Sequence, residues 1–209
     1  MKALSPTVFI VDDDDAVRNS LKLLIKSIGM TVVGFASAAE FLAAYKPEQP
    51  GCLVLDIRMP GMSGLELQQH LNMIGAVIPV VFISGHGDIP MAVEAMQHGA
   101  FDFLQKPFRD QDLIDRIQKA TERDAANRVQ LRELGRIRER VESLTARERE
   151  VLELMIRGKQ NKVMAADLQV SQRTVEIHRA RVMEKMQAAS LAQLVRMMLE
   201  VEHQTTRLG

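Results

Sequence analysis

Aspartates follow two short apolar segments in the first third of the chain. Asp12 and Asp13 come directly after residues 8–11, and Asp56 follows residues 52–55. Apolar runs of four or five β-forming residues that end in an acid are typical of buried parallel strands, whose carboxyl ends are where ligands bind. We therefore expect the three carboxylates to converge on one anionic site. Such a site either holds a cation or has strongly raised carboxyl pKa values.

Metal-assisted phosphoryl transfer is the chemistry that suits this set of acids. Asp13 and Asp56 could hold a divalent ion, because Mg²⁺ prefers oxygen ligands in octahedral geometry. The ion would neutralise charge on an incoming phosphoryl group, and a carboxylate could then act as nucleophile to form an aspartyl phosphate. The new oxygens need a cation and a hydrogen-bond donor. Lys106 and Ser84 stand at the ends of two further predicted strands and provide both.

The elements that must position these residues alternate between strand and helix over residues 1–120. The pattern predicts strands at residues 7–11, 31–35, 52–55, 79–84 and 101–105. Apolar residues at helical spacing follow each strand, and the first helix is predicted to end at Gly29. Five such repeats imply a doubly wound α/β fold, in which helices cover both faces of a five-stranded parallel sheet.

Some polar residues near the acids have a structural interpretation. We interpret Asp14 and Asp15 as caps of the first helix, because negative charge suits a helix N-terminus. Ser37 and Ser63 are predicted to cap the next two helices. His86 could ligate a metal in isolation, but we favour its interpretation as a loop residue beside the site.

Residues 121–143 are rich in Arg and Glu and contain no proline, which predicts a helical linker. Its apolar residues are spaced 3, 3, 4 and 3 apart, at Leu131, Leu134, Ile137, Val141 and Leu144. This spacing is compatible with a self-pairing coiled coil, and equally with a helix that packs on a neighbouring domain. The sequence leaves the two alternatives open.

The last part of the chain, residues 144–209, is predicted to be all helical. Thr145 and Glu148 form a capping-box pattern, and Ser171 is the predicted N-cap of a helix over residues 172–186. A shorter helix at 161–168 precedes it, joined by a three-residue turn, and a final helix is predicted at 190–202. Two helices joined in this way, the second with exposed Arg and Thr, are typical of a helix-turn-helix DNA-binding domain.

Charge and composition agree with two halves that have different partners. The chain has 209 residues and no net charge. Residues 1–120 carry 14 acidic and 10 basic side chains, whereas residues 144–209 carry 8 acidic and 11 basic ones. The single cysteine, Cys52, suits a reducing compartment and is expected in the core. No apolar stretch approaches 18 residues, so we expect a soluble, cytoplasmic protein with no membrane contact.

Four motifs in the expected order resemble those of a known family. They are Val11-Asp12-Asp13, the stretch from Leu55 to Gly64, Ser84-Gly85-His86-Gly87-Asp88, and Lys106-Pro107-Phe108. Together they look like the receiver domain of two-component response regulators.

The motifs of residues 144–209 are Leu144-Thr145-x-Arg147-Glu148, Gly158-x-x-Asn161-Lys162 and Thr174-Val175-x-x-His178. They resemble the LuxR-type helix-turn-helix of the NarL/FixJ family. The stretch 84–100 and the Pro107-Phe108 ending look most like the FixJ branch. The resemblance implies a CheY-like receiver at residues 1–120, a linker at 121–143 and a four-helix DNA-binding domain at 144–209.

The resemblance assigns a role to each residue of the first site. It implies that Asp56 is the phospho-acceptor and that Asp12 and Asp13 are the acidic pair, with Asp13 a direct ligand of Mg²⁺ (or Mn²⁺). The backbone carbonyl of Arg58 matches the third protein ligand of the metal.

Three further positions match the family's phosphate switch. Ser84 matches the hydroxyl and Lys106 the lysine that pairs with the phosphate. The aromatic position falls on Phe103, where many members have Tyr. Because Phe cannot donate a hydrogen bond, any switching there would involve packing alone.

The family match also implies which residues face DNA. Glu176, Ile177 and Ala180 occupy the base-facing positions, and candidates for backbone contacts are Arg173, Thr174, Arg179, Arg181, Lys162 and Lys185. Glu176 could accept a hydrogen bond from cytosine or could instead pair with a neighbouring arginine. We expect His178 to be packed and hydrogen-bonded to backbone.

The resulting hypothesis is a transcription regulator without enzymatic activity of its own. A cognate sensor histidine kinase would phosphorylate Asp56, and the phosphorylated protein would dimerise, bind promoter DNA and contact RNA polymerase. One alternative is an aspartyl-phosphate phosphatase, but Arg58 stands where such enzymes carry a second acid. Another is a DNA-binding protein that acts independently of phosphorylation.

Overall fold

The computed structural model describes residues 5–85 and 89–208, with the side chains of residue 89 and residues 203–208 left aside. The chain divides into two compact units, Met1–Arg128 and Val129–Gly209. Each unit is described by itself below.

The first unit contains a five-stranded parallel sheet, as predicted. Its strands are β1 (Thr7–Val11), β2 (Thr31–Phe35), β3 (Gly51–Asp56), β4 (Val80–Ser84) and β5 (Asp102–Gln105). Their spatial order is β2-β1-β3-β4-β5. This order places the ends of β1, β3 and β4 side by side, so residues that follow these strands can form one site.

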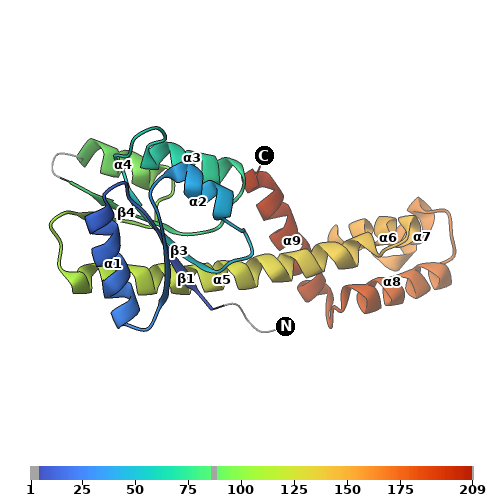
Figure 1. Cartoon of the computed structure of the whole chain (residues 1–209). Helices are drawn as coiled ribbons and strands as arrows, with labels where there is room; N and C mark the ends of the chain where they lie inside the picture. Colours follow the sequence, from blue (N-terminus) through green and yellow to red (C-terminus); the bar gives the residue numbers. More distant parts are fainter. Residues whose placement is uncertain (1–4, 86–88, 209) are drawn as a thin grey trace. The chain divides into compact units, whose positions relative to one another are not determined.

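Four helices connect successive strands, a fifth follows β5, and together they cover the sheet (Figure 1). They are α1 (Asp15–Ser27), α2 (Ala38–Ala44), α3 (Gly64–Met73), α4 (Ile89–Gln97) and α5 (Asp110–Glu142). The predicted caps are confirmed, since Asp14, Ser37 and Ser63 each accept hydrogen bonds from the first turn of α1, α2 and α3. The caps fix the residue at which each helix begins, and so they fix the length of the loop between strand and helix.

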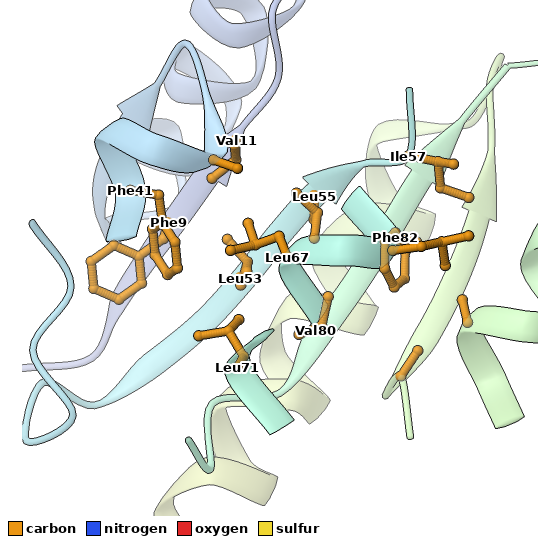
Figure 2. Packing of buried hydrophobic residues seen from close by; sticks show 14 of the residues in the cluster. Phe9, Val11, Phe41, Leu53, Leu55, Ile57, Leu67, Leu71, Val80 and Phe82 are labelled. Carbon is orange, nitrogen blue, oxygen red and sulfur yellow. The ribbon is translucent and has the colours of Figure 1, made fainter. Parts of the chain in front are cut away.

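Alternating strand residues produce an apolar layer on each face of the sheet. Phe9 and Leu53 point to one face, where Figure 2 shows them with Phe41 of α2 and Leu67 of α3. Val8, Ile10 and their neighbours on β3 and β4 form the other layer, against α1 and α5. Cys52 lies in this second layer, fully buried as predicted, and burial raises the pKa of its thiol to about 12.

Helix α5 continues without a break from the first unit into the second. Near its middle, Asp124 is buried and accepts hydrogen bonds from the Gly51 amide at 2.8 Å and from Arg128 Nε at 2.7 Å. Arg128 also donates to the carbonyls of Pro47 and Gln49, at 2.6 and 2.8 Å. The part of α5 up to Arg128 is therefore fastened to the segment that leads into β3.

The second unit is helical. Besides the end of α5 it contains α6 (Ala146–Ile156), α7 (Asn161–Asp167), α8 (Gln172–Met186) and α9 (Leu191–Leu208). The capping box of Thr145 and Glu148 and the Ser171 cap are confirmed. Ile137 and Val141 of the predicted linker pack with the core of this unit, so these positions follow the domain-packing alternative. No helix in the described ranges is long and apolar enough to cross a membrane.

Candidate functional site

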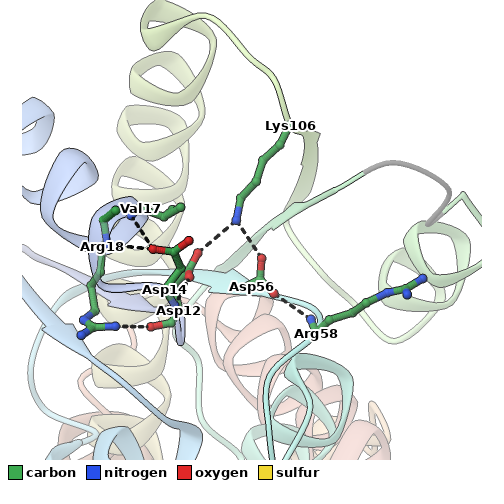
Figure 3. Close-up of polar contacts among 8 residues, drawn as sticks. Asp12, Asp14, Val17, Arg18, Asp56, Arg58 and Lys106 are labelled. Carbon is green, nitrogen blue, oxygen red and sulfur yellow. Dashed lines mark hydrogen bonds and ion pairs between the residues drawn. The ribbon is translucent and has the colours of Figure 1, made fainter.

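Side chains from three strand ends and one loop meet at the carboxyl edge of the sheet. Asp12, Asp56 and Ser84 are all buried there, at the ends of β1, β3 and β4. Lys106, which follows β5, reaches back so that its Nζ lies 3.1 Å from Asp12 Oδ2 and 2.9 Å from Asp56 Oδ1 (Figure 3). The structure thus brings together four of the predicted site residues.

Backbone contacts hold Asp56 and its surroundings. The Arg58 amide donates to Asp56 Oδ2 at 2.8 Å. Gly64, at the start of α3, lies so near that a Cβ there would be 2.2 Å from the carbonyl oxygen of Asp56. On the other side, the Lys106 amide donates to the Ser84 carbonyl at 2.7 Å, which joins the end of β4 to the loop that carries the lysine.

Burial and the lysine have opposite effects on the charge state of Asp56. Burial raises the pKa of Asp56, hydrogen bonding to Lys106 opposes the shift, and the net pKa is above its usual value. For Lys106, burial lowers the pKa, but its bonds to Asp56 and Asp12 outweigh this and leave the pKa raised. The ammonium is therefore charged, and it favours the carboxylate form of Asp56.

The acids that follow β1 lie in different environments. Asp12 Oδ1 accepts a hydrogen bond from the Asp14 amide at 2.9 Å, and Asp14 caps α1 by accepting from Ala16 and Val17. Asp13, in contrast, is exposed. The prediction that Asp14 is a cap is confirmed.

The prediction that Asp12, Asp13, Asp56 and the Arg58 carbonyl bind a divalent ion stays a prediction. Across residues 5–85 and 89–208, no three His, Cys, Asp or Glu side chains are grouped closely enough to hold a metal ion. The Lys106 ammonium lies within hydrogen-bond distance of Asp12 and Asp56, while Asp13 is exposed. The donors themselves, three carboxylates and the Arg58 carbonyl, are all oxygens and so fit the preference of Mg²⁺.

Phe103 and Arg18 contact the surroundings of the acidic site in different ways. Phe103 is half-buried and packs against the core layer that contains Phe9 and Phe41, in keeping with a position that acts through packing. His86 lies outside the described residues. Arg18 was missed by the sequence interpretation, although its Nη1 donates to the Asp12 carbonyl at 2.6 Å. A basic residue six positions after Asp12, on the first helix, was the available signal.

In the second unit, α8 presents the predicted polar face to solvent. Val175, Val182 and Met186 are buried beneath it. The exposed residues of the face are Arg173, Glu176, Ile177, Ala180 and Arg181; Thr174 and Arg179 are half-buried, and Lys162 of α7 is exposed.

Two residues of α8 bear on the alternatives that the sequence left open. Glu176 lies 3.5 Å from Arg173 Nη1, so the pairing alternative is formed in this structure. His178 is half-buried as expected, but its Nδ1 is buried without a hydrogen-bond partner, so the predicted bond to backbone is not made through this atom.

Lys185 is the exception among the proposed DNA contacts. Its Nζ lies 2.6 Å from Glu148 Oε2 and 3.2 Å from the Ser143 carbonyl. Hydrogen bonding to Lys185 and to the Thr145 backbone lowers the pKa of the buried Glu148 to about 2. In this structure the ammonium of Lys185 joins α8 to the start of α6, because a buried carboxylate needs a counter-charge. The expectation that Lys185 contacts phosphate stays a prediction.

Comparison with known proteins identifies the class to which this fold and site belong. Residues 8–118 match the response regulator receiver domain, and residues 142–198 match the bacterial regulatory proteins of the luxR family. The chain belongs to the response regulators that combine these two domains.

Named proteins of two bacteria are similar to this protein over most of the chain. Nodulation protein W of Bradyrhizobium diazoefficiens is 49% identical over 91% of this chain and 84% of its own. The transcriptional regulatory protein FixJ of Azorhizobium caulinodans is 50% identical over 92% and 91%. Among solved structures, the response regulator StyR has a TM-score of 0.82 at 47% identity, covering 94% of this chain and 99% of that one. Full-length FixJ from B. japonicum has a TM-score of 0.58 at 40% identity, covering 96% and 98%.

These similarities extend through both units, so they confirm the resemblance to the FixJ type of response regulator. The protein is a two-component response regulator in which a receiver domain is joined to a DNA-binding domain that controls transcription.

Proposed function

We propose that Asp56 accepts a phosphoryl group from a sensor histidine kinase, and that the phosphorylated protein dimerises and binds promoter DNA. The observation that carries the proposal is the position of Lys106 Nζ, within hydrogen-bond distance of both Asp12 and Asp56 at neighbouring strand ends. A cation that already bridges these carboxylates is placed to pair with new phosphate oxygens on Asp56.

The chain's own residues divide the work at the acceptor site. Asp12, Asp13 and the Arg58 carbonyl would hold Mg²⁺ together with Asp56, and the ion when bound would neutralise charge on the phosphoryl group. Asp56 must be ionised to act as nucleophile, and Lys106 favours that form. The buried Ser84 supplies a hydroxyl on the next strand end for the phosphate oxygens.

The proposed output begins at the face formed by α4, β5 and α5. Val93 and Met96 are exposed on α4 and, with Ala92 and Gln97, line an apolar depression there. An exposed apolar surface of this kind favours pairing of two receivers once Ser84 and Lys106 move to meet the phosphate and this face repacks.

Dimerisation then adds avidity for DNA. Glu176, Ile177 and Ala180 would face bases, while Arg173, Thr174, Arg179, Arg181 and Lys162 would contact the phosphate backbone. A single domain with 11 basic and 8 acidic side chains has a small net charge and binds weakly, so two half-sites bound by a dimer give a useful switch. The dimer bound to promoter DNA would then contact RNA polymerase.

Phosphorylation of the acceptor is tested with radiolabelled acetyl phosphate and Mg²⁺. We expect the wild-type protein to be labelled and Asp56→Asn not to be. Asp115→Asn, which changes an acid on the solvent side of α5, is the matched control and should be labelled as well as the wild type. Labelling of Asp56→Asn at the wild-type level would exclude Asp56 as the acceptor.

Output is tested by footprinting on genomic fragments with and without beryllofluoride, together with the mass of the protein in solution. We expect beryllofluoride to increase both the dimer fraction and the protection of specific sites. Equal promoter affinity in both conditions would favour the alternative that acts independently of phosphorylation. Turnover of an external phosphate ester at enzyme-like rates would favour the phosphatase alternative, which Arg58 argues against.

A further inference from the structure

The side chain of Arg18 connects α1 to the strand end that carries the acidic pair. Its Nη1 donates to the backbone carbonyl of Asp12 at 2.6 Å (Figure 3). Its Nη2 forms an ion pair with Asp15. Only 11% of the Arg18 side chain is exposed. A buried, charge-assisted hydrogen bond of this kind is strong and directional.

This bond completes the set of contacts around Asp12. The Asp12 amide donates to the Phe35 carbonyl at 3.3 Å, Oδ1 accepts from the Asp14 amide, and Oδ2 accepts from Lys106. Its carbonyl oxygen is the remaining polar group, and Arg18 binds it. Because that carbonyl and the amide of Asp13 belong to one planar peptide unit, fixing the first also fixes the direction in which the chain enters Asp13.

The neighbouring strand leaves space for this arrangement. A Cβ at Gly34 of β2 would lie 3.1 Å from Cγ of Arg18 and 2.3 Å from Cε of Lys22. The glycine therefore lets the stems of both basic side chains lie across the edge strand, with the Arg18 guanidinium directed at the end of β1.

We propose that Arg18 is a positioning residue for the acidic pair, which sets the orientation of Asp12 and Asp13 for Mg²⁺. The proposal rests on the proposed function of the site. Arg18 touches no ligand itself; it acts through the Asp12–Asp13 peptide, as outer groups do when they orient metal ligands. A purely structural role, in which the Arg18–Asp15 pair only stabilises α1, predicts instead that metal affinity is independent of the guanidinium.

The experiment is a Mg²⁺ titration of the unphosphorylated full-length protein, followed by the NMR shift of the Asp13 amide. Arg18→Met keeps the buried aliphatic stem and removes the donors, whereas Arg18→Lys keeps the charge with one donor group. Lys26→Met is the matched control, because it removes the same charge from the last turn of the same helix. We expect the half-saturating Mg²⁺ concentration to rise about 10-fold in Arg18→Met, less in Arg18→Lys, and not in Lys26→Met.

Equal half-saturation in Arg18→Met and the wild type would overturn the proposal, as would an equal rise in Lys26→Met. Circular dichroism checks the fold. If Arg18→Met does not fold, the comparison of Arg18→Lys with Lys26→Met decides, and equal values overturn the proposal. The titration needs no phosphorylation, so failure of wild-type labelling would remove the proposed function while the Mg²⁺ result still stands for Arg18.

Discussion

The ammonium nitrogen of Lys106 lies 2.9 Å from a carboxylate oxygen of Asp56, although fifty positions separate the two residues in the chain. The contact spans the sheet, because Asp56 ends β3, Lys106 follows β5, and β4 lies between these strands. The hydrogen bond from Lys106 therefore influences the pKa of Asp56 from the far side of β4. Phosphorylation would change this pair first.

The charge of Asp56 should make stability depend on pH. Since burial raises its pKa in the folded state above 3.8, the folded protein holds the proton more tightly than the unfolded chain does. Stability from this group therefore falls as pH rises from about 3.8 through the folded-state pKa. Asp56→Asn has no such dependence, so we expect the free energy of unfolding of the variant, relative to the wild type, to increase between pH 4 and pH 7 in urea titrations. A difference that decreases over this range would contradict the assignment.

Gly64 should tolerate no side chain. A Cβ there would lie 2.2 Å from the Asp56 carbonyl oxygen and 3.0 Å from Cα of Ile57, and both are backbone atoms that cannot turn away. We expect Gly64→Ala to lower the free energy of unfolding of the receiver unit by about 1–3 kcal/mol, measured by urea unfolding.

Gly135→Ala is the matched control for this substitution. Gly135 lies inside α5 and a Cβ there would meet nothing within 4 Å. Because alanine loses less backbone entropy than glycine in a helix, this variant should gain about 0.5–1 kcal/mol. Equal effects of the two substitutions would show that the Asp56 carbonyl does not restrict Gly64.

Local patterns predicted much of this fold from the sequence. Asp14, Ser63 and Ser171 were identified as caps because the bonds they make are only two or three residues long. The strands and their acidic ends followed from short apolar runs, and the five repeats implied the parallel sheet. The observed strand bounds differ slightly from the predicted ones. Strand β3 begins at Gly51 rather than Cys52, because Gly51 pairs with Thr7 although glycine is not a β-forming residue.

Long-range charge pairs could not be predicted in the same way. Glu148 was identified as part of a capping box, but nothing in its spacing indicated that Lys185, 37 residues away, would lie against it. A lysine on a helix with an exposed basic face looks like a DNA contact until the packing of α6 on α8 is known. Likewise, the sequence placed Lys106 at a strand end but did not show that its ammonium would lie within 3.1 Å of Asp12 and 2.9 Å of Asp56.

The buried pair of Asp124 and Arg128 should be a large contributor to the stability of the receiver unit. Arg128→Met leaves Asp124 buried with one amide partner and no counter-charge, which costs about 3 kcal/mol for such pairs. The urea midpoint of the receiver unit measures the loss. Arg109→Met is the matched control, because its ion pair with Asp112 is at the surface and its removal should produce no measurable change. A stability equal to wild type for Arg128→Met would show that this ion pair does not stabilise the receiver unit.

Acid should weaken the second unit through Glu148. The folded-state pKa of this carboxyl is about 2, against 4.5 as its ordinary value, so its contribution is fully present above about pH 4.5 and is lost as pH falls toward 2. Glu148→Gln should remove this part of the dependence. Thermal unfolding of the second unit between pH 5 and pH 2.5 tests this, and the same slope in both proteins would contradict it.

Lys185 and Arg181 should differ in how they affect DNA binding. Arg181 is exposed on α8, so Arg181→Ala should remove one phosphate contact and reduce the slope of log binding constant against log salt by about 1. Lys185→Met should leave that slope unchanged, because its ammonium is held by Glu148, and should instead lower the stability of the second unit by about 2 kcal/mol. Fluorescence anisotropy with a labelled promoter fragment at several salt concentrations measures both slopes. A reduced salt slope for Lys185→Met, measured at a temperature where the variant is fully folded, would show that Lys185 contacts DNA phosphate.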